Sequence, residues 1–157
     1  MAMAMTLQSY LQNCKATYEV VPHAHSNSSM ETAMAARIPA DHMVKSVILG
    51  DDMGGYMMAV LPANCQVAVS KLGLHYGRNL HLASEREIAN LFSDCETGAI
   101  PAIGQAYGMK TVIDDDLGLQ SDLYFEAGDH EKLVHMETDC FFELMPEADH
   151  ARFARPM

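Results

Sequence analysis

Lys45 is the first residue whose type and position could support chemistry. It lies within a β-rich run from Val44 to Gly50 (VKSVILG), among mostly apolar neighbours. An ammonium group that points into a cleft from such a run can hold an anion or a developing oxyanion. Alternate residues of a strand face opposite sides, so an outward-facing lysine is the competing interpretation, and spacing alone favours it.

A second candidate is the Gly98–Gly104 loop (GAIPAIG). Its glycines allow backbone N–H groups to approach a ligand closely, and Pro101 stiffens the chain between them. Such a loop can present hydrogen-bond donors to a carbonyl or phosphate oxygen. An ordinary connection between two elements explains the same residues equally well.

Histidines provide the third group of candidates. His130 follows Gly128 and Asp129, whose turn preferences predict a hairpin turn, and could act as a general base or a hydrogen-bond donor near neutral pH. His23 and His25 are two residues apart and would share a face of an extended chain. No third ligand follows at a defined spacing, so we expect no metal site and interpret this pair as polar residues at a strand end and cleft rim.

The elements that must position these groups indicate an α+β fold. Strands come in groups with helices between the groups, which predicts a mixed β-sheet closing toward a barrel with surrounding helices. Thr6, Ser28, Ser84 and Thr138 are the expected helix caps. We expect one domain over residues 1–157, with its core at about 6–144 and a polar C-terminal tail that frays.

Composition excludes several classes of protein. The net charge of −11 argues against a broad basic face for DNA or RNA and against an anionic membrane surface. No apolar stretch approaches the roughly 20 residues of a membrane span, and the N-terminus does not resemble a secretory signal. Four cysteines without a CxxC pair predict reduced thiols in a cytoplasmic protein. Asp114–Asp116 is interpreted as a solvated turn, and no phosphate-binding or dinucleotide-binding glycine motif is present.

Taken in order, seven segments of the chain carry a family resemblance. They are His23–Ser26 (HAHS), Glu31–Ala33 (ETA), Val44–Leu49 (VKSVIL), Gly55–Pro62 (GYMMAVLP), Leu82–Glu85 (LASE), Gly98–Pro101 (GAIP) and Tyr124–His130 (YFEAGDH). The series resembles the YbaK/EbsC-like family of aminoacyl-tRNA editing domains, which includes free-standing relatives of the editing insertion of bacterial prolyl-tRNA synthetases. The resemblance runs from about Tyr18 to Leu144.

This resemblance implies both an activity and partners. The expected activity is trans-editing, the hydrolysis of the ester between a wrong amino acid and tRNA, most often tRNA for proline. The implied partner is the acceptor end of an aminoacyl-tRNA, delivered by a synthetase or an elongation factor, and no cofactor is expected. The alternative is a tRNA- or ligand-binding module of the same fold that has lost hydrolysis.

The resemblance also implies site residues. The family's lysine matches Lys45, and its glycine/proline loop matches Gly98, Ala99, Ile100 and Pro101, which we expect to be catalytic. Ala102 stands where the family commonly has a second proline, so the loop departs from the pattern there. The residues expected to contact substrate are His25, Met30, Met34, Ser46, Met58, Ala102, Gly104 and His130.

Overall fold

The computed structural model describes residues 3–26 and 28–157. The helices are α1 (Met5–Asn13), α2 (Ser29–Ala35), α3 (Val69–Tyr76), α4 (Glu85–Leu91) and α5 (Thr138–Glu143), with 3-10 turns η1 (Gly104–Tyr107) and η2 (Asp115–Leu119). The strands are β1 (Glu19–Pro22), β2 (Met43–Asp51), β3 (Tyr56–Pro62), β4 (Cys65–Val67), β5 (Leu80–Leu82), β6 (Lys110–Asp114), β7 (Asp122–Glu126), β8 (Lys132–Glu137), β9 (Asp149–Ala151) and β10 (Ala154–Pro156). No helix in the described ranges is long and apolar enough to cross a membrane.

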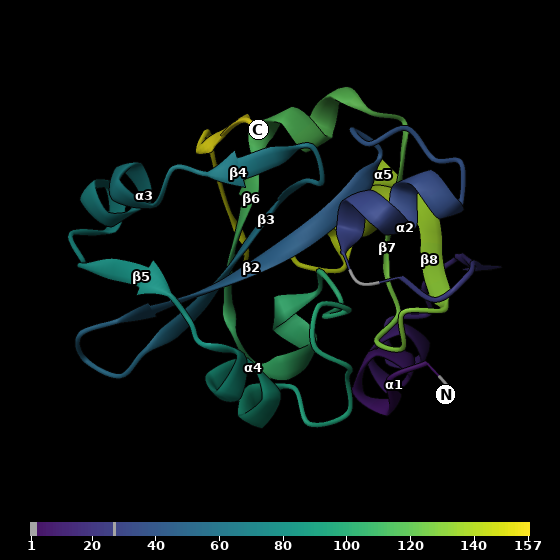
Figure 1. The fold of residues 1–157 in the computed structure, drawn as a ribbon, viewed down its shortest axis with the longest axis horizontal. Helices are drawn as coiled ribbons and strands as arrows, with labels where there is room; N and C mark the ends of the chain where they lie inside the picture. Colours follow the sequence, from purple (N-terminus) through teal and green to yellow (C-terminus); the bar gives the residue numbers. More distant parts are fainter. Residues whose placement is uncertain (1–2, 27) are drawn as a thin grey trace.

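The hairpin of β2 and β3 forms the centre of the main sheet (Figure 1). The strand order is β1-β8-β7-β2-β3-β6-β9, and β5 pairs with the far end of β2. The pairs β2–β7, β3–β6 and β6–β9 are parallel, whereas the remaining pairs of this sheet are antiparallel. The predicted α+β fold with a mixed sheet is therefore confirmed.

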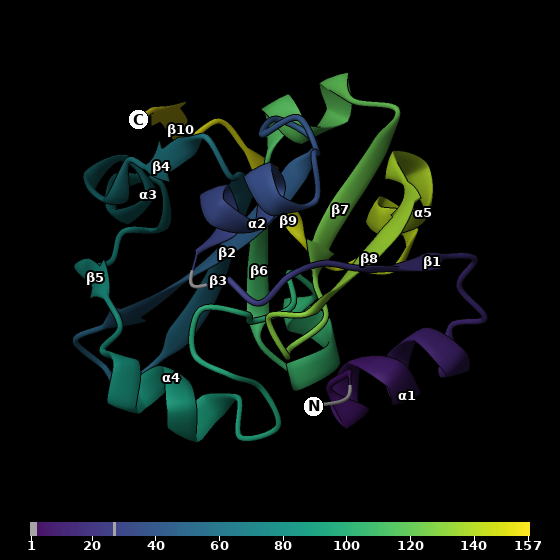
Figure 2. The same ribbon diagram turned by 45° about the vertical axis from the view of Figure 1, so that its right-hand side comes forward.

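The long β2 strand positions the candidate site because it lies between β3 and β7 and carries Lys45 near its start. Helix α2 lies against β2, and α4 lies beyond the other end of that strand (Figure 2). The main core on the sheet includes Ile48 of β2, Val60 of β3 and Phe125 of β7. These buried side chains fix the wall from which Lys45 projects.

Two of the four expected helix caps are confirmed. The Ser28 hydroxyl accepts a hydrogen bond from the Glu31 N–H, and Ser84 forms a reciprocal capping box with Glu87. Thr6 and Thr138 were predicted wrongly, because α1 begins before Thr6 and the Thr138 hydroxyl donates to the Gln120 carbonyl. A hydroxyl engaged by a neighbouring turn is not available to its own helix.

The prediction of a frayed C-terminal tail is wrong. Strand β9 pairs with β6, β10 pairs with β4, and Phe153 between them is only 1% exposed. Asp114 explains the anchorage, because its buried carboxylate accepts hydrogen bonds from the backbone N–H groups of Phe153 and Ala154, both at 2.9 Å. Asp114 is thus a structural residue, and the interpretation of 114–116 as a solvated turn does not hold for it.

Candidate functional site

A cavity of about 250 Å³ lies between β2, the Gly98–Gly104 loop and the end of β7. Four residues of the predicted site line it, namely Lys45, Ser46, Gly98 and Ile100. The other lining residues, which the sequence analysis did not assign to the site, are Ser29, Val44, Val47, Ile48, Leu82, Ala83, Ile88 and Glu126. We call this space the Lys45 cavity, and its wall is mostly apolar with a few polar groups, as is usual for small-ligand sites.

Lys45 is half-buried at the wall of the cavity. Its ammonium donates a hydrogen bond to the Met157 sulfur at 3.5 Å, and it forms no ion pair with any described carboxylate. Burial lowers the pKa of Lys45. An ammonium with a weak sulfur partner and no counter-ion is suited to receive an anionic or developing anionic group.

Ser46 joins β2 to the Gly98–Gly104 loop. Its hydroxyl donates a hydrogen bond to the Ile100 carbonyl at 3.1 Å. Gly98 adopts a positive φ of 86°, a conformation that L side chains rarely adopt. The Ala99 N–H already donates to the Glu96 carbonyl, and Pro101 has no N–H. The N–H groups of Gly98 and Ile100 are therefore the candidate donors toward the cavity.

The turn between β7 and β8 holds the segment that leads into the loop. The Gly128 carbonyl accepts a hydrogen bond from the Glu96 N–H at 2.8 Å, and the ring Nε2 of His130 bonds the Thr97 carbonyl at 2.6 Å. Since a carbonyl can only accept, His130 carries its proton on Nε2. His130 therefore connects the predicted hairpin turn to the residue that precedes Gly98.

Glu126 is the charged group that the sequence analysis missed. It is 3% exposed, lines the Lys45 cavity, and places a carboxylate oxygen 3.7 Å from Nε2 of the buried His23. Burial raises the pKa of Glu126 to about 7; the charges of Asp129 and Glu96 add to the rise, and the Thr32 hydroxyl opposes it. The sequence does hold one indication of Glu126: it is an acidic residue within the mostly apolar run DLYFEA, and such a run predicts burial.

Several predicted site residues lie away from the cavity lining. Four residues of the loop are buried on its inner side, namely Ala99, Pro101, Ala102 and Gly104. A side chain at Gly104 would overlap the Thr111 hydroxyl. The sequence did not reveal this packing, because it does not show which loop residues face inward. These four residues pack against the core and do not line the cavity, so the part they have at the site is to support the loop backbone.

The three methionines that were expected to contact substrate, Met30, Met34 and Met58, do not line the cavity. Met34 is 77% exposed, because α2 turns Thr32 and Ala33 toward the protein instead. Met58 is fully buried in the core, since β3 is covered on both faces. Met30 packs on the small cluster that contains Ala33, outside the cavity lining.

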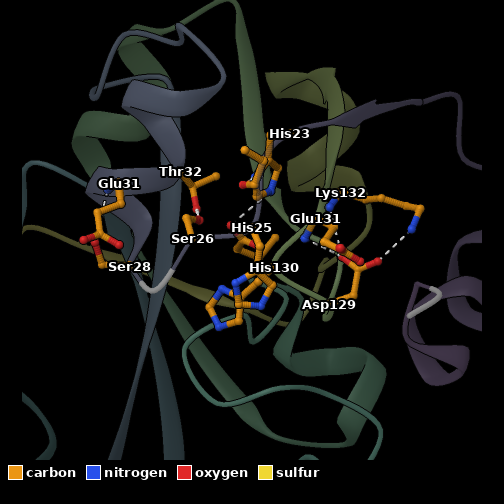
Figure 3. A network of polar contacts seen from close by, with 12 residues as sticks. His23, His25, Ser26, Ser28, Glu31, Thr32, Asp129, His130, Glu131 and Lys132 are labelled. Carbon is orange, nitrogen blue, oxygen red and sulfur yellow. Dashed lines mark hydrogen bonds and ion pairs between the residues drawn. The ribbon is translucent and has the colours of Figure 1, made fainter.

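His25 and His130 form a pair beside the cavity instead of lining it. Their ring centroids are 5.3 Å apart, and Figure 3 shows the two rings next to each other near His23. Nε2 of His25 lies 3.5 Å from a carboxylate oxygen of Glu96. In the described part of the chain, no three or more His, Cys, Asp or Glu side chains are grouped as a metal ion would require.

Three of the four cysteines are poor candidates for a nucleophile. All four are free thiols, and burial raises the pKa of Cys95 to about 12. Burial also raises the pKa of Cys65 and Cys140. Because the thiolate is the reactive form, these three side chains stay protonated and weakly nucleophilic at neutral pH.

The family described as an aminoacyl-tRNA editing domain matches residues 23–144, a range that holds every residue lining the cavity. The chain belongs to this family. The resemblance of the sequence to YbaK-like editing domains is confirmed, although no curated protein matches the chain.

Solved structures share the fold of this editing domain. A hypothetical protein aligns with a TM-score of 0.86 at 18% identity, over 96% of this chain and 99% of that chain. A proposed trans-editing enzyme for prolyl-tRNA synthetase aligns with a TM-score of 0.84 at 19% identity, over 97% of this chain and 96% of that chain. A proposed signal transduction protein from Marinobacter aquaeolei aligns with a TM-score of 0.76 at 22% identity, over 98% of this chain but 31% of that chain.

Proposed function

We propose that this editing domain acts in trans as an aminoacyl-tRNA deacylase and hydrolyses the ester of tRNA for proline that carries a small wrong amino acid. The observation that carries the proposal is that Lys45, whose ammonium has a weak sulfur partner and no carboxylate counter-ion, lines a small cavity together with Gly98 and Ile100. Membership of the editing family supplies the substrate class, and the proposed trans-editing enzyme among the fold relatives supports the choice of tRNA.

The proposed reaction uses water as the nucleophile, which the neighbouring ribose hydroxyl of the substrate helps to activate. With a cysteinyl ester the substrate thiol attacks instead and forms a thiolactone, which water then hydrolyses. In either case the nucleophile gives up a proton as it attacks, and that proton is the one the ribose oxygen takes up when it leaves. The nucleophile adds to the ester carbonyl, whose electron pair moves onto oxygen. The N–H groups of Gly98 and Ile100 and the Lys45 ammonium stabilise that oxyanion. Collapse re-forms the carbonyl and breaks the bond to the ribose oxygen, which leaves as a hydroxyl after taking up a proton.

The size of the cavity supports a small aminoacyl group. A space of about 250 Å³ also has to admit part of the terminal ribose. A pocket distinguishes side chains that differ by one methylene by only about 10- to 200-fold, which explains why a second, hydrolytic sieve is useful. The acidic surface supports a small tRNA footprint at the acceptor end.

The test is to measure loss of ester from tRNA for proline charged with alanine, serine, threonine, cysteine or 2-aminobutyrate, with correctly charged prolyl-tRNA as the control. We expect hydrolysis of at least one wrong ester and sparing of the prolyl ester. Binding to the panel without hydrolysis would instead support the binding module. Turnover of simple aminoacyl esters as fast as of the tRNA esters would point to a hydrolase that does not act on RNA.

A further inference from the structure

Four side chains beside the Lys45 cavity hold buried polar atoms without a hydrogen-bond partner among the described residues. These atoms are Nε2 of His23, Oε2 of Glu96, both carboxylate oxygens of Glu126, and Nδ1 of His130. Buried polar atoms are normally paired, because leaving one unpaired is costly in free energy. Such a group of acceptors next to a cavity is suited to bind a ligand that brings donors.

Each of these atoms is a hydrogen-bond acceptor when the two histidines are neutral. Nδ1 of His23 lies 2.7 Å from the Ala24 carbonyl, so it must be the nitrogen that carries the proton. The same reasoning places the proton of His130 on Nε2, beside the Thr97 carbonyl. Only the Thr32 hydroxyl, which acts on Glu126, and Nε2 of His25, which lies 3.5 Å from Glu96, bring a donor near these acceptors. The Glu126 end of the cavity is therefore complementary to a group with N–H donors and positive charge.

We propose that Glu126 binds the α-ammonium group of the aminoacyl ester and thereby restricts the substrate to esters with a free amino group. This inference rests on the proposed function. The α-ammonium is two bonds from the ester carbonyl carbon, and Glu126 lines the same cavity as Gly98 and Ile100, the candidate oxyanion donors. One aminoacyl group can therefore place its carbonyl at the loop and its ammonium at Glu126.

His23 acts as a positioning residue behind Glu126. It has no exposed side-chain surface and does not line the cavity, so it reaches the ligand only through the carboxylate that lies 3.7 Å away. Figure 3 shows His23 above the rings of His25 and His130 in the same network.

The charges around Glu126 determine how binding depends on pH. Two carboxylates act on Glu126, namely Glu96 from the segment before Gly98 and Asp129 from the β7–β8 turn. His23, which follows β1, lies 3.7 Å from it, and Lys45 lines the same cavity. Helix α2 contributes the neutral Thr32 hydroxyl. His25 lies against Glu96, and Lys132 forms an ion pair with Asp129 at 2.9 Å.

Because the pKa of Glu126 is about 7, the carboxylate gains a proton below pH 7 and loses its attraction for an ammonium. We expect KM to rise as the pH falls below 7.

The experiment compares the best-hydrolysed ester of the tRNA panel with its N-methyl and N-acetyl forms. N-methylation keeps the positive charge, whereas acetylation removes it. We expect the wild-type protein to lose roughly 10- to 100-fold in kcat/KM on acetylation, the effect of one lost charged hydrogen bond, and to change little on methylation.

Glu126→Gln and Glu137→Gln provide the matched variants, since both replace a carboxyl group by an amide of the same size and Glu137 is exposed outside the cavity. Glu126→Gln should raise KM for the free-amino ester, flatten its dependence on pH, and remove most of the discrimination against the acetylated ester. Glu137→Gln should match the wild-type protein. A fall in kcat that is equal for free and acetylated esters would instead make Glu126 the base for the attacking water and overturn the assignment.

The two proposals fail in different ways. A wild-type protein that hydrolyses free and acetylated esters equally well contradicts the ammonium site and leaves the deacylase proposal standing. A protein that hydrolyses no ester contradicts the deacylase proposal. The ammonium site is then tested by calorimetric binding of 3′-(alanylamino)-3′-deoxyadenosine, whose amide bond resists hydrolysis. Binding equal to that of its N-acetyl form would overturn the inference.

Discussion

At the scale of single residues, Lys45 and Glu126 bring opposite charges to one small cavity. Burial disfavours the charged form of both side chains, lowering the pKa of Lys45 and raising the pKa of Glu126. Neither has a counter-ion that would hold it in place: Lys45 contacts a sulfur, and the carboxylate of Glu126 faces His23 at 3.7 Å. Such groups remain available to a ligand that carries both signs of charge.

Glu126 should make the stability of the protein depend on pH. Its pKa rises from 4.5 to about 7 on folding, so the folded state holds more protons than the unfolded state within that range. The free energy of unfolding should therefore fall as the pH rises from 4.5 to 7, by about 3 kcal/mol from this group. Glu126→Gln should remove this component. Chemical denaturation of both proteins at pH 5 and pH 8 checks the prediction, and an equal pH dependence in the two would contradict it.

At the scale of elements, the Gly98–Gly104 loop is held from two sides. Ser46 on β2 bonds the Ile100 carbonyl, and the β7–β8 turn bonds the Glu96 N–H and the Thr97 carbonyl. Its backbone is thus fixed before a substrate arrives, which is the condition for effective oxyanion stabilisation.

Ser46→Ala should displace the loop without unfolding the protein. Loss of one hydrogen bond should lower the free energy of unfolding by about 1 kcal/mol. Misplacement of the N–H donors should lower kcat by about 10- to 100-fold with little change in KM. Ser46→Thr keeps the hydroxyl and is the control. Steady-state kinetics with a mischarged tRNA checks this, and an unchanged kcat in Ser46→Ala would show that the bond to Ile100 is dispensable.

Gly104 should tolerate no side chain. An ideal Cβ at this position would lie 2.1 Å from the Thr111 hydroxyl oxygen, inside the packed junction of η1 and β6. Gly104→Ala should therefore lower the free energy of unfolding by about 1–3 kcal/mol, the usual cost of overpacking. Thermal unfolding of Gly104→Ala, of Thr111→Ala and of the double variant tests the cause. If the double variant recovers none of the loss, the clash with Thr111 is not the reason.

The sequence predicted local elements better than long-range contacts. The β2–β3 hairpin and the caps at Ser28 and Ser84 follow from patterns within a few residues, and each is present. Asp114 and Glu126 could not be assigned in the same way, because their surroundings come from segments distant in the sequence. The family resemblance pointed to Lys45 and the Gly98–Gly104 loop. It did not distinguish the loop residues that line the cavity from the loop residues that are buried in the core.

At the scale of the whole molecule, the C-terminal segment completes the fold. Strands β9 and β10 join different sheets, and Phe153 between them packs in the cluster of Leu49, Leu61 and Val67. Met157 then reaches the Lys45 ammonium. The segment outside the family match therefore contributes to both the core and the edge of the site.

Phe153→Ala should be strongly destabilising. The side chain is almost fully buried, so its truncation should cost about 3–5 kcal/mol of unfolding free energy. Arg152→Ala is the adjacent control, because its side chain is mostly exposed and pairs with Asp116 only at 3.9 Å. We expect the control to change stability by no more than about 0.5 kcal/mol. Urea denaturation compares the two, and similar midpoints would contradict the structural role of the segment.

Lys45 provides the most direct test of the deacylase account. The measurement is the rate at which Lys45→Ala releases the amino acid from the mischarged tRNA that the wild-type protein hydrolyses best, with Lys71→Ala as a charge-matched control on the exposed face of α3. We predict a rate about 100- to 1000-fold below wild type for Lys45→Ala, folded as judged by circular dichroism, and a near wild-type rate for Lys71→Ala. Full activity in a folded Lys45→Ala variant would contradict the account.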